Sequence, residues 1–252
     1  MDQNPVIRLL AKIFSYLFHP LFIAAYVTVL LLWLEPVNKL LISNSNKPRM
    51  LAMVILYTII FPAFSVFLLW RLQFIKSIYL HTQKERIIPL VTSMFFFFWI
   101  YYVSRNLEYF PLSLKNLFLG IFLSSAIALF VNAFNKISMH GLAMGGLVSF
   151  FFIQQFTDAY WNPYWSIIAL IIAGMVCSSR LILKAHRSLE IYLGVFMGSA
   201  CQVIAYFVLP YFGYTVNTGY FHESKDSCQE KLAQCQKDLI KSGLDGAKET
   251  CD

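Results

Sequence analysis

The sequence predicts an all-α integral membrane protein: a bundle of about six to seven transmembrane helices with a soluble, helical C-terminal tail. Its 252 residues are 58% hydrophobic and only 13% charged, whereas a soluble domain is about 45–50% apolar and about 25% charged. The mean hydropathy is +0.62. Only six of the thirteen Asp and Glu residues precede residue 222, so the apolar part of the chain has almost no carboxylates. This composition excludes an ordinary globular domain, a disordered chain and a basic nucleic-acid binder.

Seven apolar runs, bounded by charges, Pro or Asn, approach or exceed the roughly 20 helical residues that cross a bilayer. They cover residues 13–34, 50–70, 87–103, 114–134, 141–156, 164–178 and 191–212. The fifth and sixth runs are short, and a polar turn at 158–163 separates them, so a re-entrant pair or one interrupted segment is the alternative. The first run is too long for a signal peptide and is expected to remain as an anchor. Within it, His19 and Pro20 predict a kink or a packing site.

The composition changes after Phe212, which predicts a transmembrane domain over residues 1–213 and a polar tail over residues 214–252. Residues 224–241 are helix-permissive. On a continuous helix Cys228 and Cys235 lie about 10 Å apart, too far for a disulfide with each other. Pairing through Cys251 or between chains requires an oxidising compartment. The tail is the expected contact for a protein partner or for self-association.

Seven spans place the N-terminus and the tail on opposite sides of a membrane, which we expect to be a bacterial inner (plasma) membrane. The N-terminal face has ten basic residues, and the other face, without the tail, has five. Positive charge favours the cytoplasm, but the same cations suit an anionic ligand. The orientation therefore stays open, while the tail is expected opposite the candidate active site.

Polar side chains are costly near the membrane and suggest function where they cluster. Three clusters stand at the ends of apolar runs, at residues 84–89, 135–141 and 179–190. The parity of the spans brings all three to the N-terminal face. They therefore predict one composite site.

The residue types in these clusters suit phosphoryl transfer. His186 and Glu190 are i,i+4 neighbours on a helix, so the carboxylate can accept from one ring nitrogen and leave the other as a nucleophile. The planar guanidinium of Arg180 suits the oxygens of a phosphate. His140 opens a helix after Ser138, where backbone N–H groups and the helix dipole favour an anion. Together these residues predict a site that needs no metal and no other cofactor.

The third cluster resembles a motif of the type 2 phosphatidic acid phosphatase family, also called lipid phosphate phosphatases. That motif is Ser-Arg, with a His six residues after the Arg and an Asp four further on. It is matched here by Ser179, Arg180 and His186, with Glu190 at the Asp position.

The other two motifs of the family match less completely. Pro-Ser-Gly-His is matched at Ser138 and His140, with Ile137 and Met139 in the remaining places. The motif of a Lys followed by Arg-Pro is matched loosely by Lys84, Arg86 and Pro89. The resemblance covers about residues 76–212, and the order of the motifs is that of the family.

The resemblance implies a phosphohistidine mechanism. His186 would attack phosphorus with Glu190 orienting it, and His140 would protonate the leaving group and later activate water. The phosphate would be held by Arg180, Ser138, Lys84 and Arg86, with Lys136 and Ser179 as further candidates. Two departures, Glu190 for Asp and Met139 for Gly, weaken the match, because a misplacement of about 1 Å can cost about 10²-fold in rate.

The sequence thus predicts a membrane phosphatase that hydrolyses a phosphatidate-like or prenyl phosphate or diphosphate, with membrane lipids around it. The alternative is a catalytically weak or inactive protein of the same fold that binds lipids or forms a complex. A prenyltransferase needs Asp-rich motifs for Mg²⁺, which the apolar part of the chain lacks. A transporter usually has repeated halves with broken helices, and no such repeat is visible in the sequence.

Overall fold

The computed structural model describes residues 5–74 and 83–212, and every regular element within them is helical. The chain divides into two units, Met1–Phe212 and Gly213–Asp252. The second unit contains the tail cysteines and the expected tail helix at 224–241, and it lies outside the described residues.

The first half of the described chain is built from helices with breaks. The elements are α1 (Pro5–Leu17), α2 (Pro20–Val29) with the π-helical turn η1 (Leu30–Leu34), α3 (Pro36–Leu41), α4 (Asn46–Ile55), η2 (Leu56–Ile60) and α5 (Phe61–Arg71). The second half has long, separate helices. These are α6 (Gln83–Arg105), α7 (Leu112–Asn132), α8 (Met139–Thr157), α9 (Tyr164–Ile182) and α10 (Ser188–Val208), which ends in the short η3 (Leu209–Phe212).

Five of the described helical stretches are long and apolar enough to cross a membrane. They are Asn46–Arg71, Ile87–Arg105, Leu112–Asn132, Tyr164–Ile182 and Ser188–Val208. The bent pair Pro5–Leu17 and Pro20–Leu34 makes a sixth if it counts as one span. This confirms an all-helical architecture of the membrane type.

The expected count of seven runs is corrected at two places. The first run is bent by 64° between α1 and α2, which confirms the kink expected at His19 and Pro20. α8 is a helix, but it is not among the stretches apolar enough to span, because it carries His140 near its start and Gln154 and Gln155 near its end.

α8 and α9 are two helices rather than one interrupted segment. The loop between them is closed by Asp158 and Asn162, whose carboxylate and amide oxygens accept from the backbone N–H groups of Tyr160 and Tyr164, each at 3.0 Å. Such local side-chain hydrogen bonds satisfy backbone N–H groups of the loop between the two helices. Among the described residues, the helix pair that could form one broken span or a re-entrant loop is α1 with α2 and η1, near the N-terminus.

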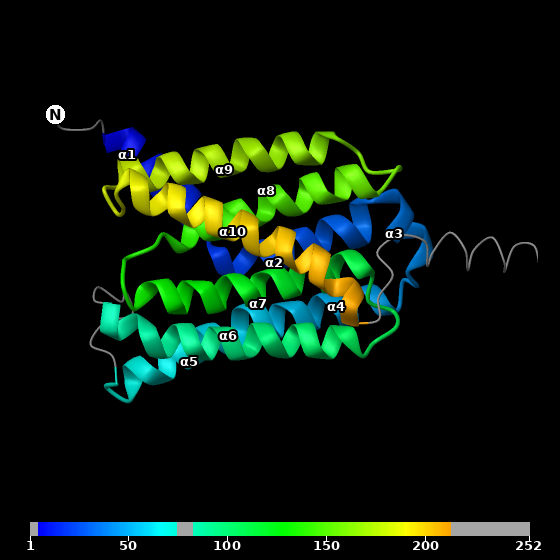
Figure 1. The fold of residues 1–252 in the computed structure, drawn as a ribbon, viewed down its shortest axis with the longest axis horizontal. Coiled ribbons are helices and arrows are strands. Elements are labelled where there is room, and N and C mark those ends of the chain that lie inside the picture. Colours follow the sequence, from blue (N-terminus) through cyan, green and yellow to red (C-terminus); the bar gives the residue numbers. More distant parts are fainter. Residues whose placement is uncertain (1–4, 75–82, 213–252) are drawn as a thin grey trace, which may run out of the picture. The chain divides into compact units, whose positions relative to one another are not determined.

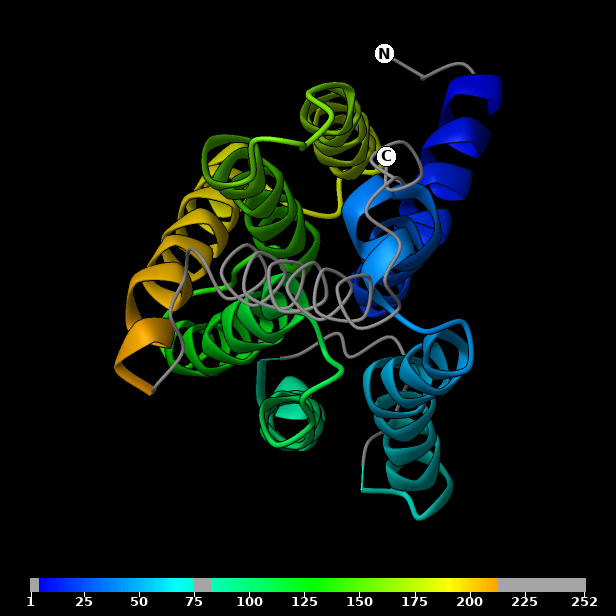
Figure 2. The same ribbon diagram turned by 90° about the vertical axis from the view of Figure 1, so that its right-hand side faces the viewer.

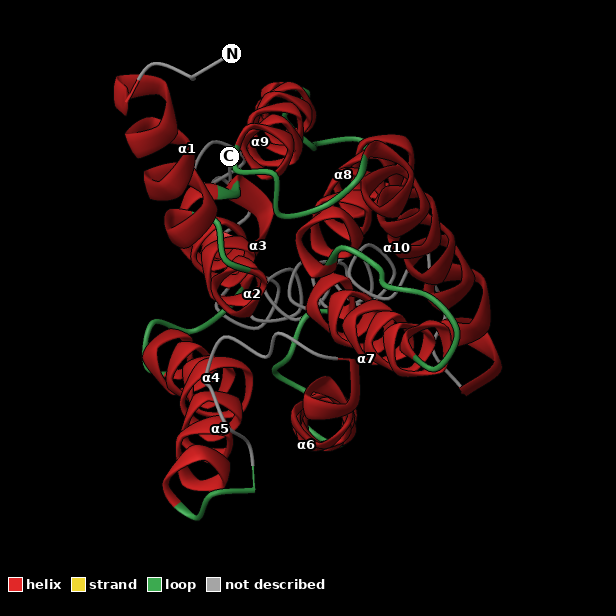
Figure 3. Cartoon of the chain, turned by 90° about the vertical axis from the view of Figure 1, so that its left-hand side faces the viewer, coloured by secondary structure: helices red, strands yellow, loops and turns green. Residues whose placement is uncertain are grey.

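The long helices run alongside one another, and the α7–α8 and α9–α10 connections lie at the same end, on the left of Figure 1. Viewed from that end, α1 neighbours α9, and α8 is paired with α10 (Figure 3). α4 and α5 pack on α2 and α6, and from the opposite end Figure 2 shows them on the side away from α10. Half of the apolar window of α7 is buried, the largest share of the five spans. The core of the bundle is therefore built around α7.

Candidate functional site

Four glycines let α8 and α10 approach backbone to backbone. A Cβ atom on Gly141 would stand 2.8 Å from the carbonyl oxygen of Ile191, and one on Gly194 would stand 2.8 Å from the carbonyl oxygen of Ser138. Added Cβ atoms on Gly145 and Gly198 would meet the backbone of the facing helix closer still. Glycines four residues apart on both helices are a known device for close helix pairs in membranes. No larger residue fits at these positions without moving a helix.

This close approach joins the second and third polar clusters of the sequence. The backbone N–H of Ser138 donates to the carbonyl oxygen of Glu190 at 3.2 Å. Ser138 is also the N-cap of α8, where its hydroxyl oxygen accepts from the N–H of Gly141 at 3.2 Å. The start of α8 and the start of α10 are thus held side by side, as the sequence predicted for these clusters.

His186 stands in the short loop between α9 and α10 and is oriented by Glu190. Its Nδ1 lies 2.6 Å from Oε2 of Glu190. A carboxylate only accepts, so Nδ1 carries the proton and the neutral ring has its lone pair on Nε2. Nε2 has no hydrogen-bond partner among the described residues. The loop reverses at Lys184, whose φ is +52°, and the N–H of Ala185 bonds back to the carbonyl of Arg180 at 3.1 Å.

The surroundings of His186 keep it uncharged near neutral pH. Its side chain is 7% exposed, and this burial lowers the pKa of His186 below the ordinary value of 6.5. The hydrogen bond that His186 donates to Glu190 raises the pKa, while the cations of Arg180 and Lys136 add to the lowering. A neutral imidazole with a free nitrogen is the form required of a nucleophile.

Arg180 and His140 meet at one residue of the N-terminal helix, Ser15. Nη1 of Arg180 donates to the hydroxyl oxygen of Ser15 at 2.7 Å. Nε2 of His140 lies 3.1 Å from the carbonyl oxygen of Ser15 and 3.4 Å from its hydroxyl oxygen. The carbonyl can only accept, so Nε2 of His140 carries a proton. Ser15 and His140 are both buried.

His19 adds a third imidazole to this group. Its ring is nearly perpendicular to that of His140, with the ring centres 5.4 Å apart. Nδ1 of His19 accepts from the N–H of Leu21 at 3.4 Å and so caps α2. The candidate site is therefore defined as Ser15, His19, Lys136, Ser138, His140, Arg180, His186 and Glu190. It draws on α1, the α1–α2 break, α8, α9, α10 and the loops between them.

The four remaining residues named from the sequence are Ser179, Lys84, Arg86 and Lys136. The hydroxyl of Ser179 donates to the carbonyl of Met175 at 2.7 Å and is thereby engaged with its own helix. Lys84 and Arg86 belong to the first turn of α6, but their side chains lie outside the described part of the chain. Lys136 is half-buried in the α7–α8 loop, close enough to act electrostatically on His186.

The candidate site combines groups with different chemical roles. Among the described residues, no three His, Cys, Asp or Glu side chains are grouped so that they could hold a metal ion. The site combines a nucleophile with its orienting carboxylate, a second imidazole that can exchange protons, and cations. These are the parts that metal-independent phosphoryl transfer requires.

Comparisons with protein-family models, with curated proteins and with solved structures found no match to this chain.

Ser15 and His19 were not assigned to the site from the sequence. The available signal was a serine and a His-Pro pair inside a run that is otherwise apolar, where polar residues are costly. His19 was interpreted as a kink, which is correct, but the kink also delivers side chains to the candidate site.

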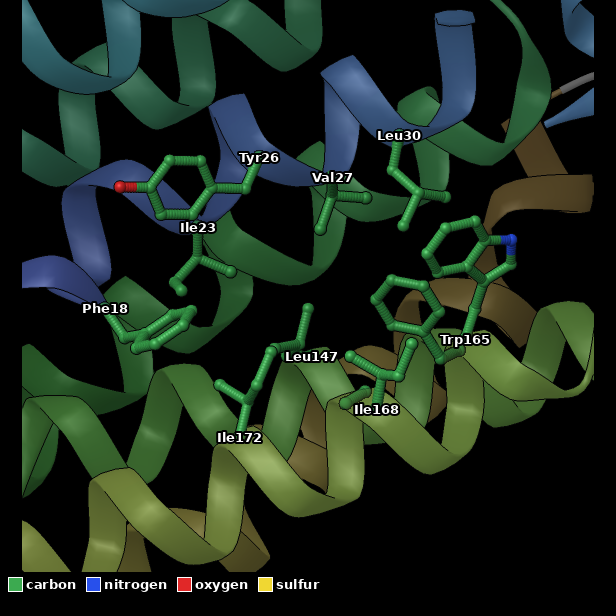
Figure 4. Close-up of a pocket in the computed structure, with 11 residues that line it drawn as sticks. Phe18, Ile23, Tyr26, Val27, Leu30, Leu147, Trp165, Ile168 and Ile172 are labelled. Atoms are coloured by element: carbon green, nitrogen blue, oxygen red, sulfur yellow. The ribbon is translucent and has the colours of Figure 1, made fainter. Parts of the chain in front are cut away.

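An apolar pocket lies between α2, α8 and α9, and none of the candidate-site residues lines it. It encloses about 100 Å³ and is lined by Phe18, Ile23, Tyr26, Val27, Leu30, Leu147, Phe151, Trp165, Ile168, Ala169 and Ile172. Figure 4 shows the α2 side chains facing Leu147 of α8 and Ile168 and Ile172 of α9. Phe18, at one end of the pocket, directly precedes His19 in the chain.

Proposed function

We propose that the protein is an integral membrane phosphatase that hydrolyses a lipid phosphate or diphosphate through a phosphohistidine intermediate. The observation that carries this proposal is the 2.6 Å contact between His186 Nδ1 and Glu190. It leaves His186 Nε2 without a hydrogen-bond partner among the described residues, within electrostatic range of Arg180 and of His140. The earlier resemblance to lipid phosphate phosphatases supports the same chemistry and remains part of the proposal.

The proposed reaction has two steps with balanced proton transfer. In the first, Nε2 of His186 attacks phosphorus, the bond from phosphorus to the leaving oxygen breaks, and His140 in its imidazolium form gives one of its two ring protons to that oxygen and becomes neutral. Burial and the charge of Arg180 lower the pKa of His140 to about 3 in the substrate-free protein, so the negative charge of the bound phosphate must favour the imidazolium for this step. In the second, water attacks the phosphohistidine while His140 takes a proton from it, which releases inorganic phosphate and restores His186. Glu190 stabilises the positive charge that develops on the ring of His186 in the first step.

The anionic phosphate would be held by Arg180 and Lys136, together with the N-terminus of α8 that Ser138 caps. Lys84 and Arg86 are proposed to assist. Arg180 is the principal ligand, because its planar group can offer two parallel N–H donors to one phosphate.

The apolar pocket supports a lipid as the substrate. Its lining side chains are hydrophobic and aromatic, and it begins at Phe18, next to His19 of the candidate site. A substrate with its phosphate at Arg180 can extend a hydrocarbon chain toward α2 and α9. A phosphatidate and a prenyl diphosphate both satisfy this description.

Met139 favours a second candidate function, a catalytically weak or inactive protein that binds lipids or forms a complex. It occupies the first position of α8, where the family motif has glycine and where a side chain restricts the approach of a phosphate to the backbone. A protein partner or self-association through the tail belongs to this second proposal.

We also propose that the protein resides in a bacterial inner membrane with its tail on the face opposite the candidate site. The course of α10 supports this, since it begins at the site with Ser188 and its 21 residues extend about 30 Å toward the tail. Labelling of Cys228 and Cys235 in intact cells with a membrane-impermeant thiol reagent tests the exposure of the tail to the outside.

The activity is tested on purified full-length protein in lipid nanodiscs. Phosphate release from a short-chain phosphatidate and from a prenyl diphosphate is measured in the presence of a chelator. The unsubstituted protein should turn over at least one of them, and His186→Ala should abolish turnover. Arg105→Lys, at the last turn of α6, is a charge-conserving control that should leave the rate unchanged, whereas Arg180→Lys should lower it. Turnover that persists in His186→Ala contradicts the mechanism, and an idle wild type favours the second candidate function.

A further inference from the structure

The break between α1 and α2 leaves the backbone carbonyl of Ser15 without its usual partner. In a continuous helix the carbonyl of Ser15 would accept from the N–H of His19, four residues later. Here the N–H of His19 bonds instead to the carbonyl of Tyr16 at 3.3 Å. Pro20 has no N–H with which to continue the helix. The carbonyl of Ser15 is thereby available to another donor.

That donor is His140, which lies 125 residues further along the chain. The 3.1 Å contact between its Nε2 and the Ser15 carbonyl fixes the proton on Nε2 and orients the ring. The hydroxyl of the same residue accepts from Nη1 of Arg180 at 2.7 Å. One buried residue on α1 therefore contacts both the proton donor and the principal phosphate ligand of the proposed mechanism.

The break itself is held by local interactions. Nδ1 of His19 caps α2 through the N–H of Leu21, and the carbonyl of His19 accepts from the N–H of Phe22 at 2.9 Å. Pro20 occupies the first turn of α2, where a missing N–H costs nothing. The bend of 64° is thus determined by the sequence His19-Pro20 and holds Ser15 over the site.

We propose that Ser15 is a positioning residue of the active site: its carbonyl selects the tautomer and orientation of His140, and its hydroxyl orients Arg180. In this scheme the His19–Pro20 break frees that carbonyl from its helical hydrogen bond. The inference rests on the proposed function for its catalytic consequence, but its structural part is independent of turnover.

The tautomer of His140 is the direct test. Full-length protein with ¹⁵N-labelled histidine is reconstituted in nanodiscs without substrate at pH 7.5, and the two ring nitrogens of each histidine are observed by NMR. His140→Gln identifies the signals of His140 by their loss. We expect the unsubstituted protein to carry the His140 proton on Nε2. A proton on Nδ1 overturns the proposal.

Two substitutions separate the roles of the carbonyl and the hydroxyl. Pro20→Ala restores an N–H at residue 20 and lets α1 continue, so that the N–H of His19 can bond to the Ser15 carbonyl. The ratio of Nε2–H to Nδ1–H tautomers of His140 should then fall about fivefold, the effect of one hydrogen bond. Pro36→Ala, at the exposed start of α3, is the matched control and should leave the ratio unchanged. An equal ratio in Pro20→Ala and in the unsubstituted protein overturns the role of the break.

Ser15→Ala keeps the carbonyl and removes only the hydroxyl. The tautomer of His140 should be unchanged, while KM for a short-chain phosphatidate rises about fivefold with kcat nearly constant, because Arg180 loses one oriented hydrogen bond. Ser65→Ala on α5, where the hydroxyl bonds its own helix at 2.8 Å, is the control. An unchanged KM in Ser15→Ala overturns the role of the hydroxyl. If the unsubstituted protein turns over no substrate, the proposed function fails while the tautomer result still decides the role of the carbonyl.

Discussion

Glu35 is a buried carboxyl group whose ionisation should set the pH dependence of stability. It lies between η1 and α3, at the far end of the first span from the candidate site, and it is fully buried. Neither of its carboxyl oxygens has a hydrogen-bond partner within residues 5–74 and 83–212. Burial, with a smaller contribution from the negative charge of Asp158, raises the pKa of Glu35 from 4.5 to about 7.

The direction of the effect follows from which state holds the proton. Between pH 4.5 and about 7 the unfolded chain has released the Glu35 proton while the folded protein retains it, so stability falls as the pH rises. Each pKa unit is worth about 1.4 kcal/mol, and the free energy of unfolding should therefore drop by about 3 kcal/mol from pH 4.5 to pH 7 and then level off. Glu35→Gln removes the titrating group and should remove this part of the slope.

The assay is the unfolding of the full-length protein by sodium dodecyl sulfate in mild-detergent micelles, followed by tryptophan fluorescence at pH 5, 6, 7 and 8. The difference in unfolding free energy between Glu35→Gln and the unsubstituted protein should increase with pH up to about 7. Glu108→Gln, which alters an exposed carboxylate in the α6–α7 loop, is the matched control and should give a nearly constant difference. Parallel pH profiles for Glu35→Gln and the unsubstituted protein would refute the reasoning.

Three further predictions concern the site and the helix pair beneath it. Glu190→Gln should lower kcat on the order of 10⁴-fold, as loss of an orienting carboxylate does elsewhere; a loss below tenfold in a phosphate-release assay contradicts the role of the 2.6 Å contact. The acid limb of the kcat/KM profile should lie below pH 6.5, because burial lowers the pKa of His186 and the neutral ring is reactive; a limb above pH 7 contradicts this. Gly198→Ala should destabilise the protein by about 1–3 kcal/mol through overpacking, whereas Gly174→Ala, whose Cβ meets nothing within 4 Å, should be tolerated; equal stabilities by detergent unfolding contradict the close α8–α10 packing.

The sequence was sufficient to predict the class of fold and part of the candidate site. Long apolar runs in lipid have only helices and closed barrels as solutions, so the apolar helices could be recognised from composition. The pairing of His186 with Glu190 is predicted by i,i+4 spacing on a helix. The pair is present, but His186 lies in the loop before α10, which begins at Ser188, so the conformation of the loop joins the two side chains. The nearness of Ser138 to Glu190 was expected only from the parity of the spans.

Other features depend on interactions between distant segments. Ser15 contacts His140 and Arg180 through hydrogen bonds that no local sequence pattern predicts. The break in the first run was predicted at His19 and Pro20, yet nothing in that segment indicated which helix its free carbonyl would face. The close fit of α8 on α10 likewise depends on glycines whose effect requires both helices, because each glycine makes room for the backbone of the other helix.

The joining of Ser15 to Arg180 across 165 residues has a consequence for biosynthesis. The first helix is synthesised early, and its Ser15 carbonyl and hydroxyl have neither His140 nor Arg180 as partners until α8 and α9 have been made. Glu190 follows later still, at the start of the last long helix. A nascent chain that has inserted most of its spans therefore possesses no assembled site. Under the proposed function, turnover therefore begins only when translation of the domain is complete, and unfinished copies cannot attack membrane lipids.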